Sequence, residues 1–267
     1  MTTAPETVRP SRRWLVVGGL VTVFVVLVGA GIAWGVVGGT GLNRVVESAR
    51  YDRAVSRIVF DDVEAGDVTV RAKSGATGVG VQRTLHWTTQ SPTIHETWDG
   101  DVLTIDFDCP RWGFGSGCGV DYTLDVPPTV QLQIQVSSGD VRLDGLTAPA
   151  RVRTTSGDVR VFDMRADQLD VQATSGDITL EDASIGTLTA ATTAGDVRAA
   201  YTKPPTSLDI TAVSGDVTVT VPRDATAYEV HLESTSGDLD TEVHSTSGAA
   251  AKIHVKTVAG DVRVRLA

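Results

Sequence analysis

The chain has 267 residues, which allows one large or two modest domains, and 41% of them are hydrophobic. Its formal net charge at pH 7 is −10, and because residues 1–13 have a local balance of +2, the remainder carries −12. This acidic remainder argues against binding of nucleic acid or anionic lipid by the large C-terminal part.

An uncharged apolar run occupies residues 14–37, WLVVGGLVTVFVVLVGAGIAWGVV. Its 24 residues exceed the roughly 20 that cross the hydrocarbon core of a bilayer. Trp14 and Trp34 lie where interfacial aromatic residues are found. The alternative is a cleaved signal peptide, whose apolar region has only about 7–15 residues. The run therefore predicts one retained transmembrane helix.

Basic residues before this run predict its orientation. Arg9, Arg12 and Arg13 immediately precede it, and positive charge is retained on the cytoplasmic side of a membrane helix. Residues 1–13 are therefore expected to form a cytoplasmic tail. Only four of the 23 basic residues are lysines, an arginine bias typical of a GC-rich bacterial genome. We expect a single-pass protein of the bacterial cytoplasmic membrane whose C-terminal domain is extracellular.

Three glycines at spacings of four, Gly31, Gly35 and Gly39, give the helix a small-residue face. Such a face lets two helices approach closely, which predicts a homodimer, although glycine is also common in membrane helices generally. Residues 38–54 follow as a predicted juxtamembrane linker.

Alternation with a period of two predicts an N-terminal β region over residues 55–130. Cys109 and Cys118 lie there in CPRWGFGSGC, and outside a membrane such a pair predicts a disulfide. Trp112 and Phe114 on the same loop are candidate binding residues, because exposed aromatic rings stack on sugars or insert into a partner. The alternative is that they cover the open end of the β structure.

Repeats of 18–23 residues, each with a Gly-Asp pair, fill residues 131–267. Apolar residues stand seven and five positions before each glycine and two after it, so each unit is predicted to be strand, tight turn, strand. Gly66 in EAGDVTV marks an outlying copy. The seven pairs are Gly139 and Asp140, Gly157 and Asp158, Gly176 and Asp177, Gly195 and Asp196, Gly215 and Asp216, Gly237 and Asp238, and Gly260 and Asp261.

The repeats predict an all-β fold, a β-solenoid of about 20-residue coils continuous with the N-terminal β region. The alternative is an antiparallel β-sandwich of hairpins, since Gly-Asp also turns a hairpin. A small residue before each glycine favours the solenoid. Because the chain ends directly after the last repeat, we expect an unpaired sheet edge at the C-terminus.

The Gly-Asp pairs are interpreted as turns rather than as a site. Glycine supplies a positive φ, and aspartate accepts hydrogen bonds from backbone amides in an Asx-type turn. Arginines two residues after four of the aspartates would offset the charge of a stacked Asp ladder: Arg142, Arg160, Arg198 and Arg263. Calcium-binding β-rolls carry more closely spaced aspartates, and acid catalysis needs carboxylates in unlike environments. We therefore predict no metal, no cofactor and no catalytic residue.

The five histidines do not cluster along the sequence: His86, His95, His231, His244 and His254. His231 and His254 alternate with apolar neighbours and are expected to point to solvent. The sequence also shows no nucleophile elbow, phosphate loop or zinc-protease motif, so we expect no enzymatic activity.

With its anchor, VDYTLDVPPTVQLQIQVSSGDVRL and the repeated SGDV units, the chain resembles the bacterial putative-adhesin family. The resemblance covers residues 55–267 and is strongest over 120–267. It implies a β-solenoid-like ectodomain at the cell envelope, and some relatives are linked to envelope-stress systems. It carries over no catalytic residues, and the Cys109–Cys118 loop is not part of the signature.

Together these features predict a membrane-anchored, surface-exposed, non-enzymatic binding or scaffolding module of the bacterial cell envelope, adhesin-like in form. Its expected ligand is a protein or a cell-wall glycan. The alternative function is a regulatory or sensory envelope-stress protein. With so short a cytoplasmic tail, such a protein would signal through a membrane partner.

Overall fold

The computed structural model describes residues 43–109 and 117–267. The predicted transmembrane segment, its glycine face and the cytoplasmic tail lie outside these ranges. Within them, no helix is long and apolar enough to cross a membrane. The described chain is all-β, as predicted, and Asn43–Ala267 forms one compact unit.

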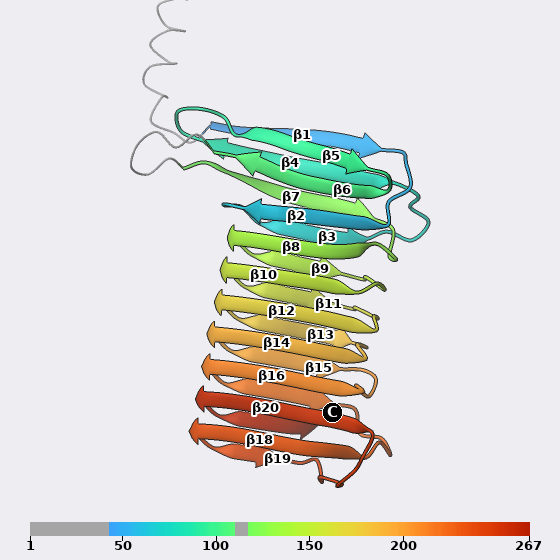
Figure 1. The fold of residues 1–267 in the computed structure, drawn as a ribbon, viewed down its shortest axis with the longest axis vertical. Helices are drawn as coiled ribbons and strands as arrows, with labels where there is room; N and C mark the ends of the chain where they lie inside the picture. Colours follow the sequence, from blue (N-terminus) through green and yellow to red (C-terminus); the bar gives the residue numbers. More distant parts are fainter. Residues whose placement is uncertain (1–42, 110–116) are drawn as a thin grey trace, which may run out of the picture. The chain divides into compact units, whose positions relative to one another are not determined.

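Two long, mostly parallel sheets face each other across one hydrophobic core (Figure 1). In spatial order, sheet A contains β1 (Asn43–Tyr51), β4 (Val79–Trp87), β7 (Gly119–Val126), β3 (Val68–Ala72), β9 (Val141–Asp144), β11 (Val159–Phe162), β13 (Ile178–Ala183), β15 (Val197–Tyr201), β17 (Val217–Val221), β21 (Val262–Leu266) and β19 (Leu239–Thr241). Sheet B contains β18 (Tyr228–Ser236), β20 (Ala251–Ala259), β16 (Ser207–Ser214), β14 (Thr187–Ala194), β12 (Gln168–Ser175), β10 (Ala150–Ser156), β8 (Gln131–Ser138), β2 (Arg57–Val63), β6 (Val102–Asp108) and β5 (Thr93–Asp99).

Each repeat is one coil, with a strand in sheet B, a Gly-Asp corner and a strand in sheet A. Neighbouring coils pair in parallel and in register, as Val152↔Val171 and Val159↔Ile178 show. Parallel pairing is the arrangement of a β-solenoid and not of consecutive hairpins, so the hairpin alternative is wrong for the repeats. The outlying copy at Gly66 is also a coil, because β2 and β3 pair with β8 and β9.

Apolar residues at the predicted inward positions form the core. Leu169, Val171 and Ile178 of one coil are all fully buried. Side chains stack on their counterparts in the next coil, so no coil has to bury its apolar face alone. The exceptions belong to one coil: Val230 and Leu232 are only partly buried, and Leu239 is 48% exposed.

The order of the last two coils differs from the order of the sequence. β20 and β21 pair with β16 and β17 on one side and with β18 and β19 on the other, so residues 251–266 lie between two earlier coils. The edge of the stack is the coil of residues 228–241, and the predicted unpaired edge at the C-terminus is wrong. The composition of the two coils agrees with this order. Val264 in the inserted coil, residues 251–266, has Thr241 as its counterpart in the edge coil, residues 228–241. The less apolar coil is therefore the one at the edge.

The N-terminal end of the stack is built from antiparallel strands. β1 pairs with β4 from Asn43↔Trp87 to Tyr51↔Val79, so most of the predicted linker over residues 38–54 is a strand. Its sequence, NRVVESARY, alternates in burial only from Glu47 onward, so the two-residue period that predicts a strand is weak here. β4 also pairs antiparallel with β7, and β5 with β6.

Candidate functional site

All seven predicted Gly-Asp pairs lie at the corner where the chain passes from sheet B to sheet A. Their glycines have φ values of 139° to 154°, and Gly66 has a φ of 138°. This region favours glycine. A Cβ built on Gly176 would lie 2.1 Å from the carbonyl oxygen of Gly157 in the adjacent coil, and the other repeats show the same approach at 2.0–2.2 Å. Glycine is therefore required both for the backbone conformation and for the spacing of the coils.

The aspartates form one continuous ladder of hydrogen bonds through the stack. The backbone N–H of Asp158 donates to Oδ1 of Asp140 at 2.9 Å, and that of Asp177 donates to Oδ1 of Asp158 at 2.9 Å. The ladder continues to the edge, where the N–H of Asp238 donates to Asp261. The donor belongs to the next coil, not to the turn of the aspartate itself as the Asx-type interpretation assumed. Each aspartate therefore links two coils.

Three arginines bind the remaining oxygens of this ladder. Arg160 contacts Oδ2 of Asp140 at 2.8 Å and Oδ2 of Asp158 at 2.6 Å. The hydrogen bond to Asp140 raises the pKa of the Arg160 guanidinium. Equivalent pairs form from Arg198 to Asp177 and Asp196, and from Arg263 to Asp216 and Asp261. Six aspartates thus have one oxygen bound to an amide and the other near a guanidinium, an arrangement that holds coils together.

Arg142 differs from the other three. It pairs with Asp144 at 3.5 Å, and its guanidinium lies 3.8 Å from the ring centroid of Phe162. Arg142 lies one coil before Phe162, whose counterparts in the two adjacent coils are Asp144 and Glu181. The sequence does not predict this contact, because Phe162 lies five residues after Gly157, beyond the part of the repeat that recurs in every coil.

The disulfide between Cys109 and Cys118 is confirmed, with a Cα–Cα distance of 5.9 Å. It joins the end of β6 in sheet B to the start of β7 in sheet A. The predicted binding residues Trp112 and Phe114 lie outside the described residues.

Other aromatic residues cover the N-terminal end of the stack. Tyr51 on β1 packs edge-on against Trp98 on β5, with ring centroids 5.3 Å apart, so the contact joins the two sheets at their outermost strands. The Tyr51 hydroxyl donates to Glu96, which also pairs with Arg83 at 2.5 Å. Burial and the hydrogen bond to Glu96 raise the pKa of Tyr51 to about 12. This cluster closes the core at the end of the stack formed by β1 and β5.

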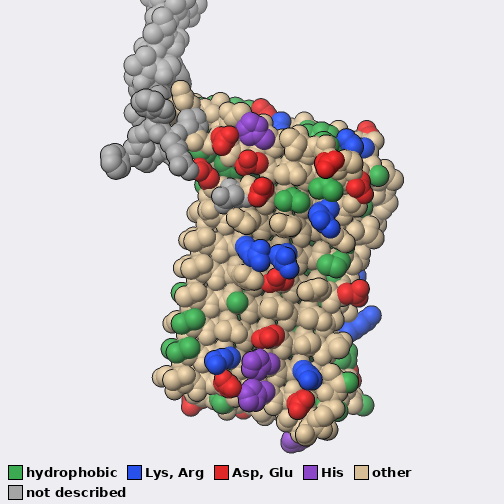
Figure 2. Space-filling view, viewed as in Figure 1, with side chains coloured by type: hydrophobic (Ala, Val, Ile, Leu, Met, Phe, Trp, Pro, Cys, Tyr) green, Lys and Arg blue, Asp and Glu red, His purple; other side chains and the backbone are tan. Residues whose placement is uncertain are grey.

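The outer face of sheet B carries a shallow groove of about 510 Å³ across β8, β10, β12, β14 and β16. It lies where the strands approach the Gly-Asp corner, and side chains at equivalent positions form columns along the stack. One column contains Gln135, Arg153 and Gln172, and the next contains Ser137, Thr155, Thr174 and Thr193. Arg153 donates to the Gln172 side chain at 3.3 Å. Figure 2 looks onto this face, which is mostly uncharged over the central strands.

Two histidines that are distant in sequence lie together farther along the same face. His231 on β18 and His254 on β20 are register partners, and their rings stack with centroids 5.4 Å apart. Both point to solvent, as predicted. Both stand six positions before the glycine of their coil, Gly237 or Gly260, so the register of the repeats aligns them although they are 23 residues apart in sequence. Purple side chains gather over this part of the face in Figure 2.

The geometry agrees with a comparison of the sequence with family models. The model described as Toastrack DUF4097 matches residues 52–265. The chain belongs to the toastrack DUF4097 family. This match includes the coil at Gly66, the disulfide, the repeats and the antiparallel strands β4 to β7, whereas β1 ends just before it.

Comparison with solved structures found similar proteins, and the first of these shares the fold. A putative adhesin from Bacteroides fragilis is 16% identical, with a TM-score of 0.57 over 82% of this chain and 97% of that chain. A putative adhesin from Parabacteroides distasonis is 12% identical, with a TM-score of 0.44 over 86% and 98%. A putative lipid binding protein from the same organism is 10% identical, with a TM-score of 0.41 over 86% and 98%. No curated protein matches the chain. At 16% identity, the likeness to the Bacteroides fragilis structure shows a shared fold and nothing about a ligand.

Proposed function

We propose that this chain is a membrane-anchored, surface-exposed binding module of the bacterial cell envelope that acts without enzymatic chemistry. The groove on sheet B carries the proposal. Its columns of amide, guanidinium and hydroxyl groups repeat at a spacing of about 4.8 Å, from β8 to β12 in one column and from β8 to β14 in the other, where Ala191 and Val213 end them. A surface with such a period suits an extended ligand with repeating polar groups, and we take a cell-wall glycan as the ligand class.

Several observations support the membrane-anchored and adhesin-like parts of the proposal. Residues 14–37 have the length and hydropathy of a membrane helix. The Bacteroides fragilis protein that shares the fold is named a putative adhesin. The acidic domain would repel anionic polymers, so a neutral glycan is favoured.

In-cell crosslinking tests this function. The full chain carries a photo-crosslinking amino acid at Thr174, which is exposed in the groove, or at Thr218, on the outer face of sheet A as a matched control. We expect an adduct with cell-wall glycan from position 174 only. The double variant with Arg153→Ala and Gln172→Ala should reduce that adduct at least tenfold, because both side chains line the groove.

Equal adducts from positions 174 and 218, or none from either, would contradict the proposed function. Capture of a membrane signalling protein at position 174 would replace it with the regulatory function.

A further inference from the structure

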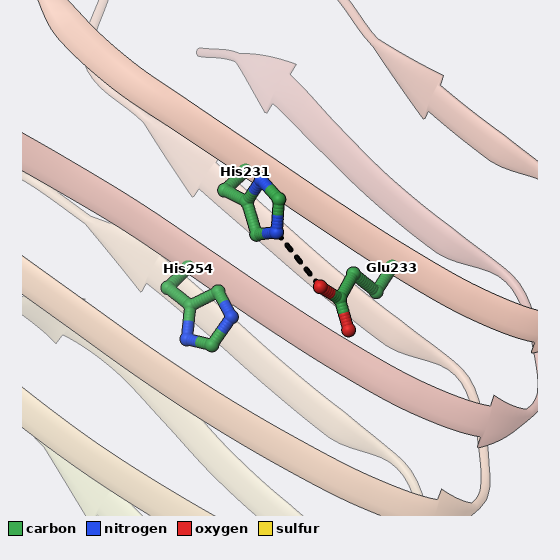
Figure 3. A group of neighbouring side chains, drawn as sticks. All are labelled: His231, Glu233 and His254. Atoms are coloured by element: carbon green, nitrogen blue, oxygen red, sulfur yellow. Dashed lines mark hydrogen bonds and ion pairs between the residues drawn. The ribbon is translucent and has the colours of Figure 1, made fainter.

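Three potential metal ligands converge on the outer face of sheet B. His231 and His254 are register partners on β18 and β20, and Glu233 follows His231 by two residues, so all three side chains point away from the core. Their ligand atoms lie within 4.8 Å of one another. Figure 3 shows the glutamate carboxylate and both imidazole rings on the same side of the strands.

The distances are close to those of a coordination sphere. Nε2 of His231 and Oε1 of Glu233 are 2.8 Å apart. Ligands of one zinc ion lie at about 2.0–2.2 Å from the metal, and so roughly 3–4 Å from one another. Small side-chain rotations are enough to bring His254 into this range, because all three side chains are at the surface and free of core packing.

A neighbouring carboxylate orients one of the ligands. Asp209 on β16 pairs with Nδ1 of His254 at 3.4 Å. Metal-binding histidines typically have a carboxylate on the ring nitrogen that does not bind the metal, which fixes the tautomer. Nε2 of His254 therefore remains available as the ligand. Asp209 lies on β16, whereas the three ligands lie on β18 and β20, so this contact is an observation separate from the convergence of the ligands.

A neighbouring lysine holds Glu233 in place. The Lys256 ammonium binds Oε2 at 3.2 Å and leaves Oε1 on the side of His231. Lys256 thus orients the carboxylate, and its positive charge opposes a cation at the same place.

We propose that His231, Glu233 and His254 form a binding site for a divalent transition-metal ion of the zinc class. Two imidazole nitrogens and one carboxylate suit zinc, copper or nickel, whereas calcium and magnesium take oxygen ligands. Water completes the coordination at this exposed position. The ion joins the edge coil to the inserted coil, because its ligands come from β18 and β20. This site is independent of the proposed function.

Calorimetric titration of the full, untagged chain in detergent with zinc chloride tests the site. We expect one ion per chain, and we expect His231→Ala and His254→Ala each to weaken binding at least tenfold. His95→Ala is the matched control, because His95 lies on β5 at the opposite edge of sheet B and pairs with Asp108. It should leave zinc affinity unchanged, and magnesium chloride should give no binding.

A second variant distinguishes loss of a ligand from loss of structure. Lys256→Met removes the competing positive charge and should tighten zinc binding several-fold, while the circular dichroism of every variant stays that of the unchanged chain. Absence of zinc binding, or binding undiminished by both histidine substitutions, would overturn the proposal.

Discussion

Replacement of Gly176 by alanine is expected to lower the free energy of unfolding by about 4 kcal/mol or more, a loss outside the usual range for one substitution. The added Cβ would lie 2.1 Å from the carbonyl oxygen of Gly157, and the backbone φ of 143° is unfavourable for alanine. The coils of Gly157 and Gly176 cannot move apart without breaking the backbone hydrogen bonds that join them in both sheets. Urea unfolding followed by circular dichroism measures the loss.

Gly75→Ala is the matched control. Gly75 also has a positive φ, 78°, but a Cβ added to it would have no other atom within 4 Å. The expected cost is only about 1–2 kcal/mol, that of a left-handed conformation alone. Equal losses in the two variants would show that backbone conformation, and not the approach of adjacent coils, makes glycine necessary.

Deletion of residues 251–267 is expected to unfold the edge coil as well as to remove the last one. The deleted segment lies between β16 and β18 in sheet B and between β17 and β19 in sheet A. It buries Ile253, Val255 and Val262 completely, and each such side chain contributes about 1.5–3 kcal/mol. Without it, residues 228–241 lose every strand partner that they have among the described residues.

Hydrogen exchange of the shortened chain measures this effect. Amides of residues 228–241 should exchange at least a hundredfold faster than in the full chain, whereas those of β10 and β12, three or more strands away, should keep their protection. Retained protection over residues 228–241 would mean that this coil pairs directly with residues 207–221.

Most of the solenoid was predictable because each coil has the same local requirements. A residue at the corner must be glycine, and residues at fixed distances from it must be apolar, so Val171 and Ile178 could be assigned to the core from the spacing alone. The disulfide was predictable because the two cysteines stand close together in a segment that the sequence predicts to be extracellular.

The order of the coils could not be predicted in the same way. Residues 228–241 and 251–266 both match the repeat, and local pattern does not say which neighbour a coil chooses. The sequence carries only weak signs of the observed order. The last two spacings between repeat glycines are the longest, at 22 and 23 residues, and Thr241 in one coil corresponds to Val264 in the other. The histidine pair does not depend on this order, because the coils of residues 228–241 and 251–266 are neighbours in either arrangement.

The candidate site was predictable only in part. The aspartates were expected to act within their own turns, and they act between coils because the N–H of each following aspartate points at the carboxylate before it. The groove was missed because its residues are ordinary polar side chains whose only signal is their repetition, as in Thr155, Thr174 and Thr193.

Pairwise cysteine crosslinking tests the stacking of coils most directly. Ser214 and Ala259 are exposed register partners, whereas Ser214 and Ser236 lie two strands apart, at about 9.6 Å. A disulfide needs Cα atoms within about 7 Å. After mild oxidation, mass spectrometry should find a crosslink in the chain with Ser214→Cys and Ala259→Cys, and none in the chain with Ser214→Cys and Ser236→Cys. The reverse result would contradict the insertion of the C-terminal coil into the stack.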